Sequence, residues 1–285
     1  MSDSLKQIWC IARFDLGTAL RTKRALAATL LYGLIAMGTG GVLVWLEVKI
    51  RTYADTAEGL VRVAATADGW DGPSSLEEVI AFLLGGDKEL AAHLLGIPLV
   101  VYGFFWVSLT FLPYLIAIVS HDMVNAELRN RSVRFSLLRT SRGAFLSGKV
   151  LAQLILLTAV TVISNLLLLA VAWVQLPAFD PGPALLYLGQ YWIYTIVFSL
   201  CWIGLTALVS SLVESAGLAL MLLFVALIGL SILSFHDDFG LLSPGAWKIG
   251  LWKPGLEALG SLAAFASFGA VFLAGAWGAL RWRDL

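Results

Sequence analysis

The sequence predicts an all-α membrane protein with six transmembrane helices. Hydrophobic residues make up 59% of the chain and charged residues only 13%, whereas soluble domains carry about 25% charge. Six stretches without a charged residue are each long enough to cross a hydrocarbon core of about 30 Å as a helix, and none shows the alternation typical of a membrane β-barrel. These stretches are residues 25–46, 94–120, 150–179, 181–213, 215–235 and 258–280.

Residues 1–24 predict an amphipathic interfacial helix, often called an elbow helix, that precedes the first span. Leu5, Ile8, Ala12 and Leu16 recur at helical spacing, while the basic residues fall on other faces. The alternative is a plain basic flank without a defined helix. A single transmembrane domain over 1–285 then holds the expected spans, at about 25–46, 96–120, 150–174, 185–211, 215–234 and 258–280.

The distribution of basic residues predicts the orientation. With six spans both termini lie on one side, and that side holds thirteen Lys and Arg residues against six on the other. Because basic residues concentrate on the cytoplasmic side, we expect a protein of the cytoplasmic (inner) membrane with both termini, and the segment 121–149, in the cytoplasm.

Two external connections are long enough to have structure of their own. In 47–96, Ser74 or Ser75 followed by two glutamates predicts the start of a short helix, and so a helical external loop. In 234–257, the spacing of Pro, Gly and Trp favours a re-entrant or interfacial hairpin, with Trp247 and Trp252 at the level of the lipid headgroups. A single histidine, His236, beside two aspartates is too weak a pattern to predict a metal site.

The motifs of most enzymes are missing from the chain. It has no phosphate-binding loop of the GxxxxGK[ST] type and no HExxH motif, and its three histidines are scattered. Ion-coupled transporters usually place ionisable residues at mid-membrane, but the cores of the six predicted spans contain none. We therefore expect no catalytic site, no cofactor and no metal on this chain, and no pump that works alone.

A few uncharged polar residues remain inside the predicted spans. Such side chains need hydrogen-bond partners in lipid, and Asn165 is the most unusual of them. They are candidates for a translocation path or a subunit interface, and the alternative is an ordinary hydrogen bond between helices. The candidates are Thr161, Asn165, Ser199 and Thr206.

The segment 121–149 is the most distinctive part of the chain, because it places six basic residues and two acids between two apolar runs. Residues 122–129 continue the second span, and 130–132 break it. Apolar residues among arginines in 133–138 predict a short amphipathic helix. Ser141 is expected to cap the helix that leads into the third span.

This segment resembles the first intracellular loop of the ABC-2 type transporter permeases. That family has acidic residues at the end of the second span, then Thr-Leu-Arg, Ser-Arg and finally Gly-Lys at the start of the third span. Here Asp122 and Glu127 occupy the acidic places, and the later motifs correspond to 132–134, 141–142 and 148–149. The opening sequence IARFDLGTALRTKRAL is also similar to the start of the family, with Arg13, Asp15, Leu20, Arg21 and Arg24 in register. Arg131 stands where the family has glycine, and a Pro-Val pair is missing.

The resemblance implies a permease subunit that works with a second permease copy, identical or related, and with two cytoplasmic ABC ATPase subunits that carry ATP and Mg. A coupling helix within 121–142 would sit in a groove of the ATPase, with Glu127 bracing it by an ion pair to Arg131 or Arg134. Membrane lipids are further partners, and nucleic acid is not. The candidate ATPase-coupling residues are Asp122, Glu127, Arg129, Arg131, Arg134, Arg139, Ser141, Arg142 and Lys149.

An uncharged path lined by aromatic and hydroxyl side chains fits an amphiphilic, lipid-like, peptide or drug-like cargo better than a small ion. A second hypothesis is a scaffold that transmits motion from a cytoplasmic ATPase to periplasmic partners through the 47–96 loop. A third, a membrane-embedded lipid transferase, lacks the acid or histidine constellation that its chemistry needs.

Overall fold

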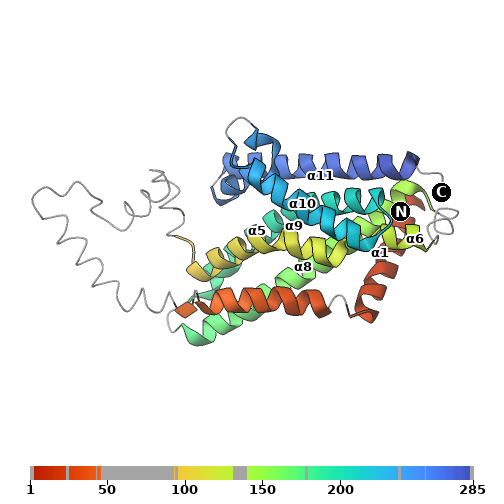
Figure 1. Ribbon diagram of the computed structural model, residues 1–285. Coiled ribbons are helices and arrows are strands. Elements are labelled where there is room, and N and C mark those ends of the chain that lie inside the picture. Colours follow the sequence, from red (N-terminus) through yellow and green to blue (C-terminus); the bar gives the residue numbers. More distant parts are fainter. Residues whose placement is uncertain are drawn as a thin grey trace, which may run out of the picture.

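The computed structural model describes residues 3–23, 26–42, 44–45, 93, 96–130, 140–176, 179–236, 239–253 and 255–282. Every regular element in these ranges is a helix (Figure 1), which confirms the all-helical class. The elements are α1 (Asp3–Arg21), a helix over Leu26–Val42, α5 (Leu99–Ser120), α6 (Asn125–Arg129), α8 (Arg142–Gln175), α9 (Pro181–Leu212), α10 (Ala216–Leu233), the 3-10 helices η1 (Gly240–Leu242) and η2 (Pro244–Trp252), and α11 (Leu256–Trp282). The predicted helix of the 47–96 loop and the predicted helix in 133–138 lie outside the described residues.

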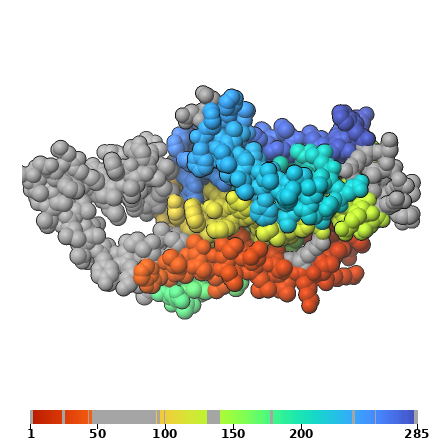
Figure 2. Space-filling model, in the orientation of Figure 1, coloured from red at the N-terminus to blue at the C-terminus, as the bar shows by residue number. Residues whose placement is uncertain are grey.

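The described helices are those of a multi-pass membrane protein. Five are long and apolar enough to cross a membrane, and the Leu26–Val42 helix, which forms a 72° bend with α1, raises the number to as many as six. Figure 2 shows α10 and the Leu26–Val42 helix on the outer surface of the bundle. The outer face of α10 is apolar, with Leu218, Met221, Val225, Ile228 and Ile232 exposed. Because an apolar face of this size is unfavourable in water, it belongs against lipid or another subunit.

Local sequence signals set where the long helices begin. Ser141 Oγ accepts a hydrogen bond from the N–H of Ala144 at 3.1 Å, which makes it the predicted N-cap of α8. Asp180 caps α9 in the same manner, and Pro181 is its first residue. Since α8 starts at Arg142, eight residues before the apolar run begins, Lys149 lies inside a continuous helix.

Small residues allow α9 and α11 to pack closely through the centre of the bundle. A Cβ atom added at Gly204 would lie 3.0 Å from the Gly269 carbonyl oxygen, and one at Gly269 would lie 3.3 Å from the Cys201 backbone. Helices in membranes commonly pack together at glycines. Lipid tails are as apolar as leucine side chains, so burying leucine provides little driving force and close contact between backbones matters more. Phe198 and Phe265 extend this contact, with ring centres 5.1 Å apart.

Aromatic rings join α5, α9 and η2 at one end of the bundle. The rings of Phe105 and Tyr191 stack with centres 4.2 Å apart, and Trp252 lies 4.6 Å from Phe105 and 4.5 Å from Tyr102. Trp252, which we expected at the headgroup level, is therefore half-buried within a ring cluster. The Trp247 ring N–H donates to the Leu241 carbonyl oxygen at 3.1 Å, which closes the η1–η2 turn.

Candidate functional site

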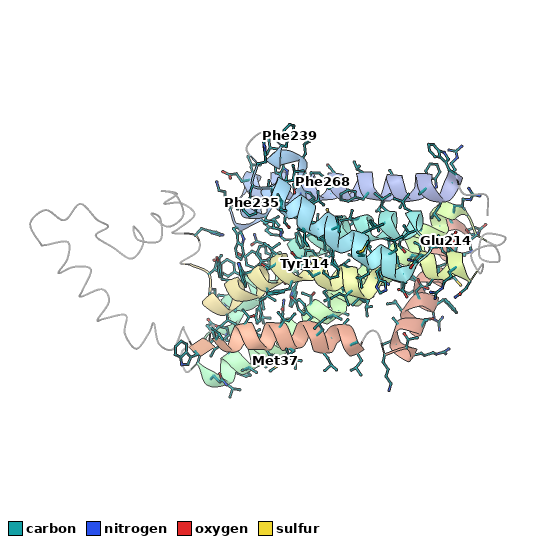
Figure 3. The ribbon with its side chains drawn as sticks, in the orientation of Figure 1. Met37, Tyr114, Glu214, Phe235, Phe239 and Phe268 are labelled. Carbon is teal, nitrogen blue, oxygen red and sulfur yellow. The ribbon has the colours of Figure 1, made fainter. Side chains whose placement is uncertain are left out.

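The other end of the bundle holds α1, α6, the start of α8 and the last turn of α11 (Figure 1), and is called the terminal end below. Glu214, in the turn between α9 and α10, also lies there (Figure 3). The chain passes through this end between α5 and α6. The described residues of the predicted coupling segment, 121–142, therefore lie mostly at the terminal end.

Helix α6 is held to α9 by a buried serine. Ser210 Oγ of α9 accepts hydrogen bonds from the backbone N–H groups of both Val124 and Asn125, each at 3.1 Å. The residue at the N-cap of α6 makes no side-chain cap of its own. Unpaired N–H groups at a buried helix start are costly, so Ser210, which is fully buried, satisfies them from a neighbouring helix.

A buried lysine joins three elements at the terminal end. The side chain of Lys149 in α8 is 7% exposed, and its Nζ lies 3.0 Å from Asp15 Oδ2 of α1. The same ammonium group pairs with Glu127 Oε1 of α6. A charge in the protein interior is strongly unfavourable unless it is paired, so Lys149 requires both helices to stay in place. We call these three residues the charge triad.

A glycine next to this lysine sets the approach of α1. A Cβ atom at Gly148 would lie 2.7 Å from Ile11 Cβ and 2.9 Å from the Ile8 carbonyl oxygen. Only glycine allows this contact without displacing α1. Asp15 lies one helical turn beyond Ile11, and the close approach brings its carboxylate to Lys149. The Gly-Lys pair of the sequence thus acts as one packing unit.

A cleft of about 240 Å³ lies between α1, the α5–α6 turn and α8, and all three residues of the charge triad line it. Asp122 is half-buried and lines it, together with Thr18, Thr22 and Gln153. Ser120 Oγ donates to Gln153 Oε1 at 2.8 Å, which links the end of α5 to α8. Water in this cleft can reach the two carboxylates of the triad, whose side chains are 16% and 22% exposed.

The other predicted coupling residues lie at different places. Arg129 is exposed at the end of α6, and Ser141 caps α8. Arg142 Nη1 donates to the Arg281 carbonyl oxygen at 2.7 Å, which ties the start of α8 to the end of α11. The remaining three, Arg131, Arg134 and Arg139, lie outside the described residues.

Glu127 pairs with Lys149, which is 22 residues further along the chain. The partners that we expected for Glu127, Arg131 or Arg134, lie outside the described residues, so that ion pair stays a prediction. Lys149 itself is buried inside the subunit, where it contacts α1 and α6.

The four candidate path residues are all buried inside the bundle. Ser199 Oγ and Thr206 Oγ1 donate to carbonyl oxygens one turn earlier in their own helix, α9, at 2.6 and 2.9 Å. Thr161 lies beside the hydroxyl of Tyr32, which itself hydrogen-bonds Ser108 at 2.7 Å. Asn165 Oδ1 has no hydrogen-bond partner among the described residues.

Sequence reasoning missed three residues of the site. Asp15 falls on the apolar face of its amphipathic helix, near Ala12 and Leu16 in helical spacing, and an acid at such a position signals a buried partner. Ser210, near the end of α9, and Gln153, inside α8, gave no such signal, because single serine and glutamine residues are common in helices.

The fold and this site define a multi-pass helical membrane protein with mostly apolar outer faces. Among the described residues, most charged side chains lie at the terminal end, and Lys149 is a buried cation there. A protein-family model described as ABC-2 family transporter protein matches residues 9–238, which include the charge triad and Ser210. The chain belongs to this family. It is therefore the membrane permease of an ABC transporter, a transport subunit that partners with ABC ATPase subunits. A comparison with curated proteins gave no match.

Proposed function

We propose that the 121–142 segment couples ATP hydrolysis on separate ATPase subunits to a rearrangement of this permease, which moves an amphiphilic cargo across the membrane. The observation that carries the proposal is the buried Lys149, which binds α1 and α6 to α8 at once. If the ATPase displaced the segment that follows α6, Glu127 would move with it. The ion pair would then displace Lys149 and the membrane-spanning helix α8.

The links around α6 are strong enough to transmit such a displacement. Breaking an ion pair that is buried on the side of Lys149 and partly exposed on the side of the carboxylates costs about 2–3 kcal/mol, and Ser210 adds two hydrogen bonds to α9. Helix α6 is therefore connected to α8, α9 and α1 by polar contacts. Sliding at any one of them would expose or unpair a buried polar group, so we expect these elements to move together.

The character of the described spans supports an amphiphilic cargo. Apart from Lys149, the buried polar residues of the described helices are Ser, Thr and Asn, and charged residues normally mark the paths of small ions in membranes. Aromatic rings gather at the opposite end, as in the Phe105–Tyr191 stack. Such surfaces suit a lipid-like, peptide or drug-like molecule.

The proposed assembly has two permease copies, identical or related, and two ATPase subunits that hold ATP and Mg. The excess of basic residues on the side of the termini supports a cytoplasmic position for the ATPase. The scaffold hypothesis rests on the 47–96 loop, which lies outside the described residues, and no observation favours it over transport.

The test is co-expression of the full chain with the ATPase subunit of the same transporter, followed by co-purification and measurement of ATPase stimulation. Glu127→Gln should leave association intact but reduce stimulation severalfold, because it weakens the link to Lys149. Arg134→Glu combined with Arg139→Glu should reduce association itself. Arg13→Gln, at an exposed position of α1, is the matched control and should behave as wild type. Full stimulation by Glu127→Gln together with normal association of the double arginine variant would refute the coupling role.

A further inference from the structure

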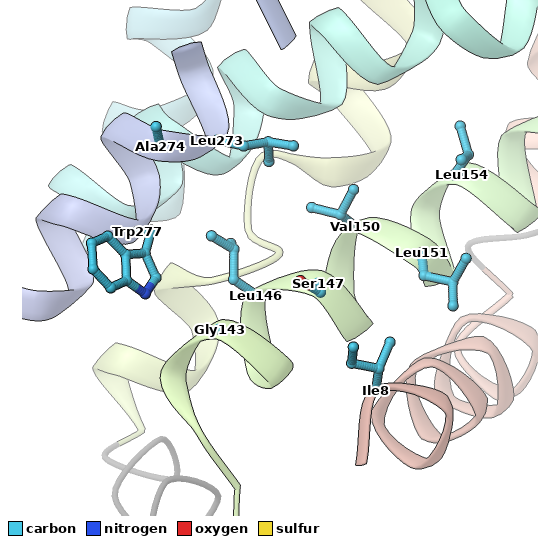
Figure 4. A pocket seen from close by; sticks show the side chains of 10 residues that line it. All are labelled: Ile8, Gly143, Leu146, Ser147, Val150, Leu151, Leu154, Leu273, Ala274 and Trp277. Carbon is cyan, nitrogen blue, oxygen red and sulfur yellow. The ribbon is translucent and has the colours of Figure 1, made fainter. Parts of the chain in front are cut away.

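A second, larger hollow of the terminal end lies away from the charge triad. It is an open groove of about 510 Å³ that crosses α8 between α1 and α11 (Figure 4). Its walls are almost entirely apolar and include Ile8 of α1, Leu146, Val150 and Leu154 of α8, and Leu273 and Trp277 of α11. The volume lies within the range of about 300–1,000 Å³ that is usual for sites of small ligands.

One rim of this groove is positively charged. The Arg281 guanidinium lies 5.3 Å from the ring centre of Trp277, which lines the groove. The Arg142 side chain reaches the Arg281 carbonyl oxygen at 2.7 Å, so the two arginines are neighbours. Neither guanidinium has a carboxylate partner among the described residues. The apolar groove thus ends at two arginine side chains that have no carboxylate partner among the described residues.

We propose that the groove is a binding site for one anionic phospholipid of the leaflet on the side of the termini. An acyl chain fills the apolar groove, and the phosphate group lies at Arg142 and Arg281. Basic pockets between transmembrane helices recognise acidic headgroups in this way. The site touches α1, α8 and α11 together, so a bound lipid holds the terminal end of the bundle. This inference goes beyond the transport role and does not depend on ATPase coupling.

The groove can be blocked without disturbing the packing of the protein. Gly143 lines it, and a Cβ atom added there meets no other atom within 4 Å. Gly143→Leu therefore extends a side chain into the groove. Gly260→Leu is the matched control, because Gly260 is an exposed position of α11 with equally open space. Arg281→Gln removes one cation from the rim, and Arg13→Gln removes an exposed cation elsewhere.

The measurement is native mass spectrometry of the full chain, titrated in detergent with phosphatidylglycerol or with phosphatidylcholine of the same acyl chains. We expect one saturable adduct with phosphatidylglycerol and weaker binding of phosphatidylcholine. Arg281→Gln should weaken the anionic adduct about fivefold, as expected for one cation near an anionic surface, and Gly143→Leu should abolish it. Both control variants should bind as wild type does.

Two results would overturn the proposal. Equal binding of both lipids, unchanged by Arg281→Gln, would mean that the groove holds ordinary boundary lipid. A shift of the oligomer mass with Gly143→Leu, while the lipid adduct is retained, would mean that a second copy of the chain covers the groove.

Discussion

Replacing Lys149 by methionine removes the cation that lies between Asp15 and Glu127. Methionine retains most of the length and apolar volume of the lysine stem, so packing against α1 and α6 is largely preserved. The two carboxylates, however, remain close together at the terminal end without the ammonium group that balances them. We therefore expect the variant to be less stable than the wild type.

The size of this loss follows from how deeply the triad is buried. Removing one partner of a fully buried ion pair costs about 3–5 kcal/mol, whereas an exposed pair contributes about 0–1 kcal/mol. Lys149 is 7% exposed, but the carboxylates are 16% and 22% exposed and line the cleft. Water there screens part of the charge, so we expect a loss of about 2–3 kcal/mol.

The assay is thermal unfolding of the full chain in detergent, followed by tryptophan fluorescence. A loss of this size corresponds to a decrease of about 5–10 °C in the unfolding midpoint.

The triple variant Lys149→Met, Asp15→Asn, Glu127→Gln provides the internal control. It carries no charge at the site, and a neutral replacement of a buried ion pair is often as stable as the pair itself. We expect it to recover most of the midpoint lost by Lys149→Met. If the single variant unfolds at the wild-type temperature, or if the triple variant recovers nothing, the reasoning from buried charge is wrong.

Two further predictions concern the packing around the charge triad, and both use the same unfolding assay. Ser210→Ala should cost about 1–2 kcal/mol, the usual cost of losing a helix cap, because the N–H groups of Val124 and Asn125 both lose their acceptor. Ser211→Ala, which removes only a bond within α9, should cost less, and equal losses would contradict the capping role. Gly148→Ala should destabilise by about 1–3 kcal/mol through overpacking against α1. Gly143→Ala, on the same helix with open space around it, should not destabilise, and a loss there equal to that at position 148 would contradict the close approach.

Much of the architecture could be predicted from the sequence, because hydrophobicity and helix capping act locally. The apolar runs correspond to long helices, and Ser141 caps α8 as its position suggested. What the sequence did not show is how the first turns of α8 pack. Gly148 lies against Ile8 and Ile11 of α1, and Phe145 and Leu146 are buried.

The candidate site was only partly predictable. The acidic and basic residues of 121–149 stood out by composition, but their partners did not. The pairing of Glu127 with Lys149 was not predicted, and Asp15 reaches the same lysine from 134 residues away. Composition shows that charged residues are present, but only the packing of the helices determines which of them form ion pairs.

The sequence by itself determined that this chain spans a membrane with helices and presents a basic segment between two of its spans, because those properties follow from the residues of each segment alone. The tertiary structure alone decided that Lys149 joins α1, α6 and α8, that Ser210 caps α6 and that Arg142 meets the end of α11. The physical reason is that each of these contacts depends on the angle and depth at which two helices cross. That geometry is set by small residues and side-chain shapes along the whole interface, and no single segment encodes it.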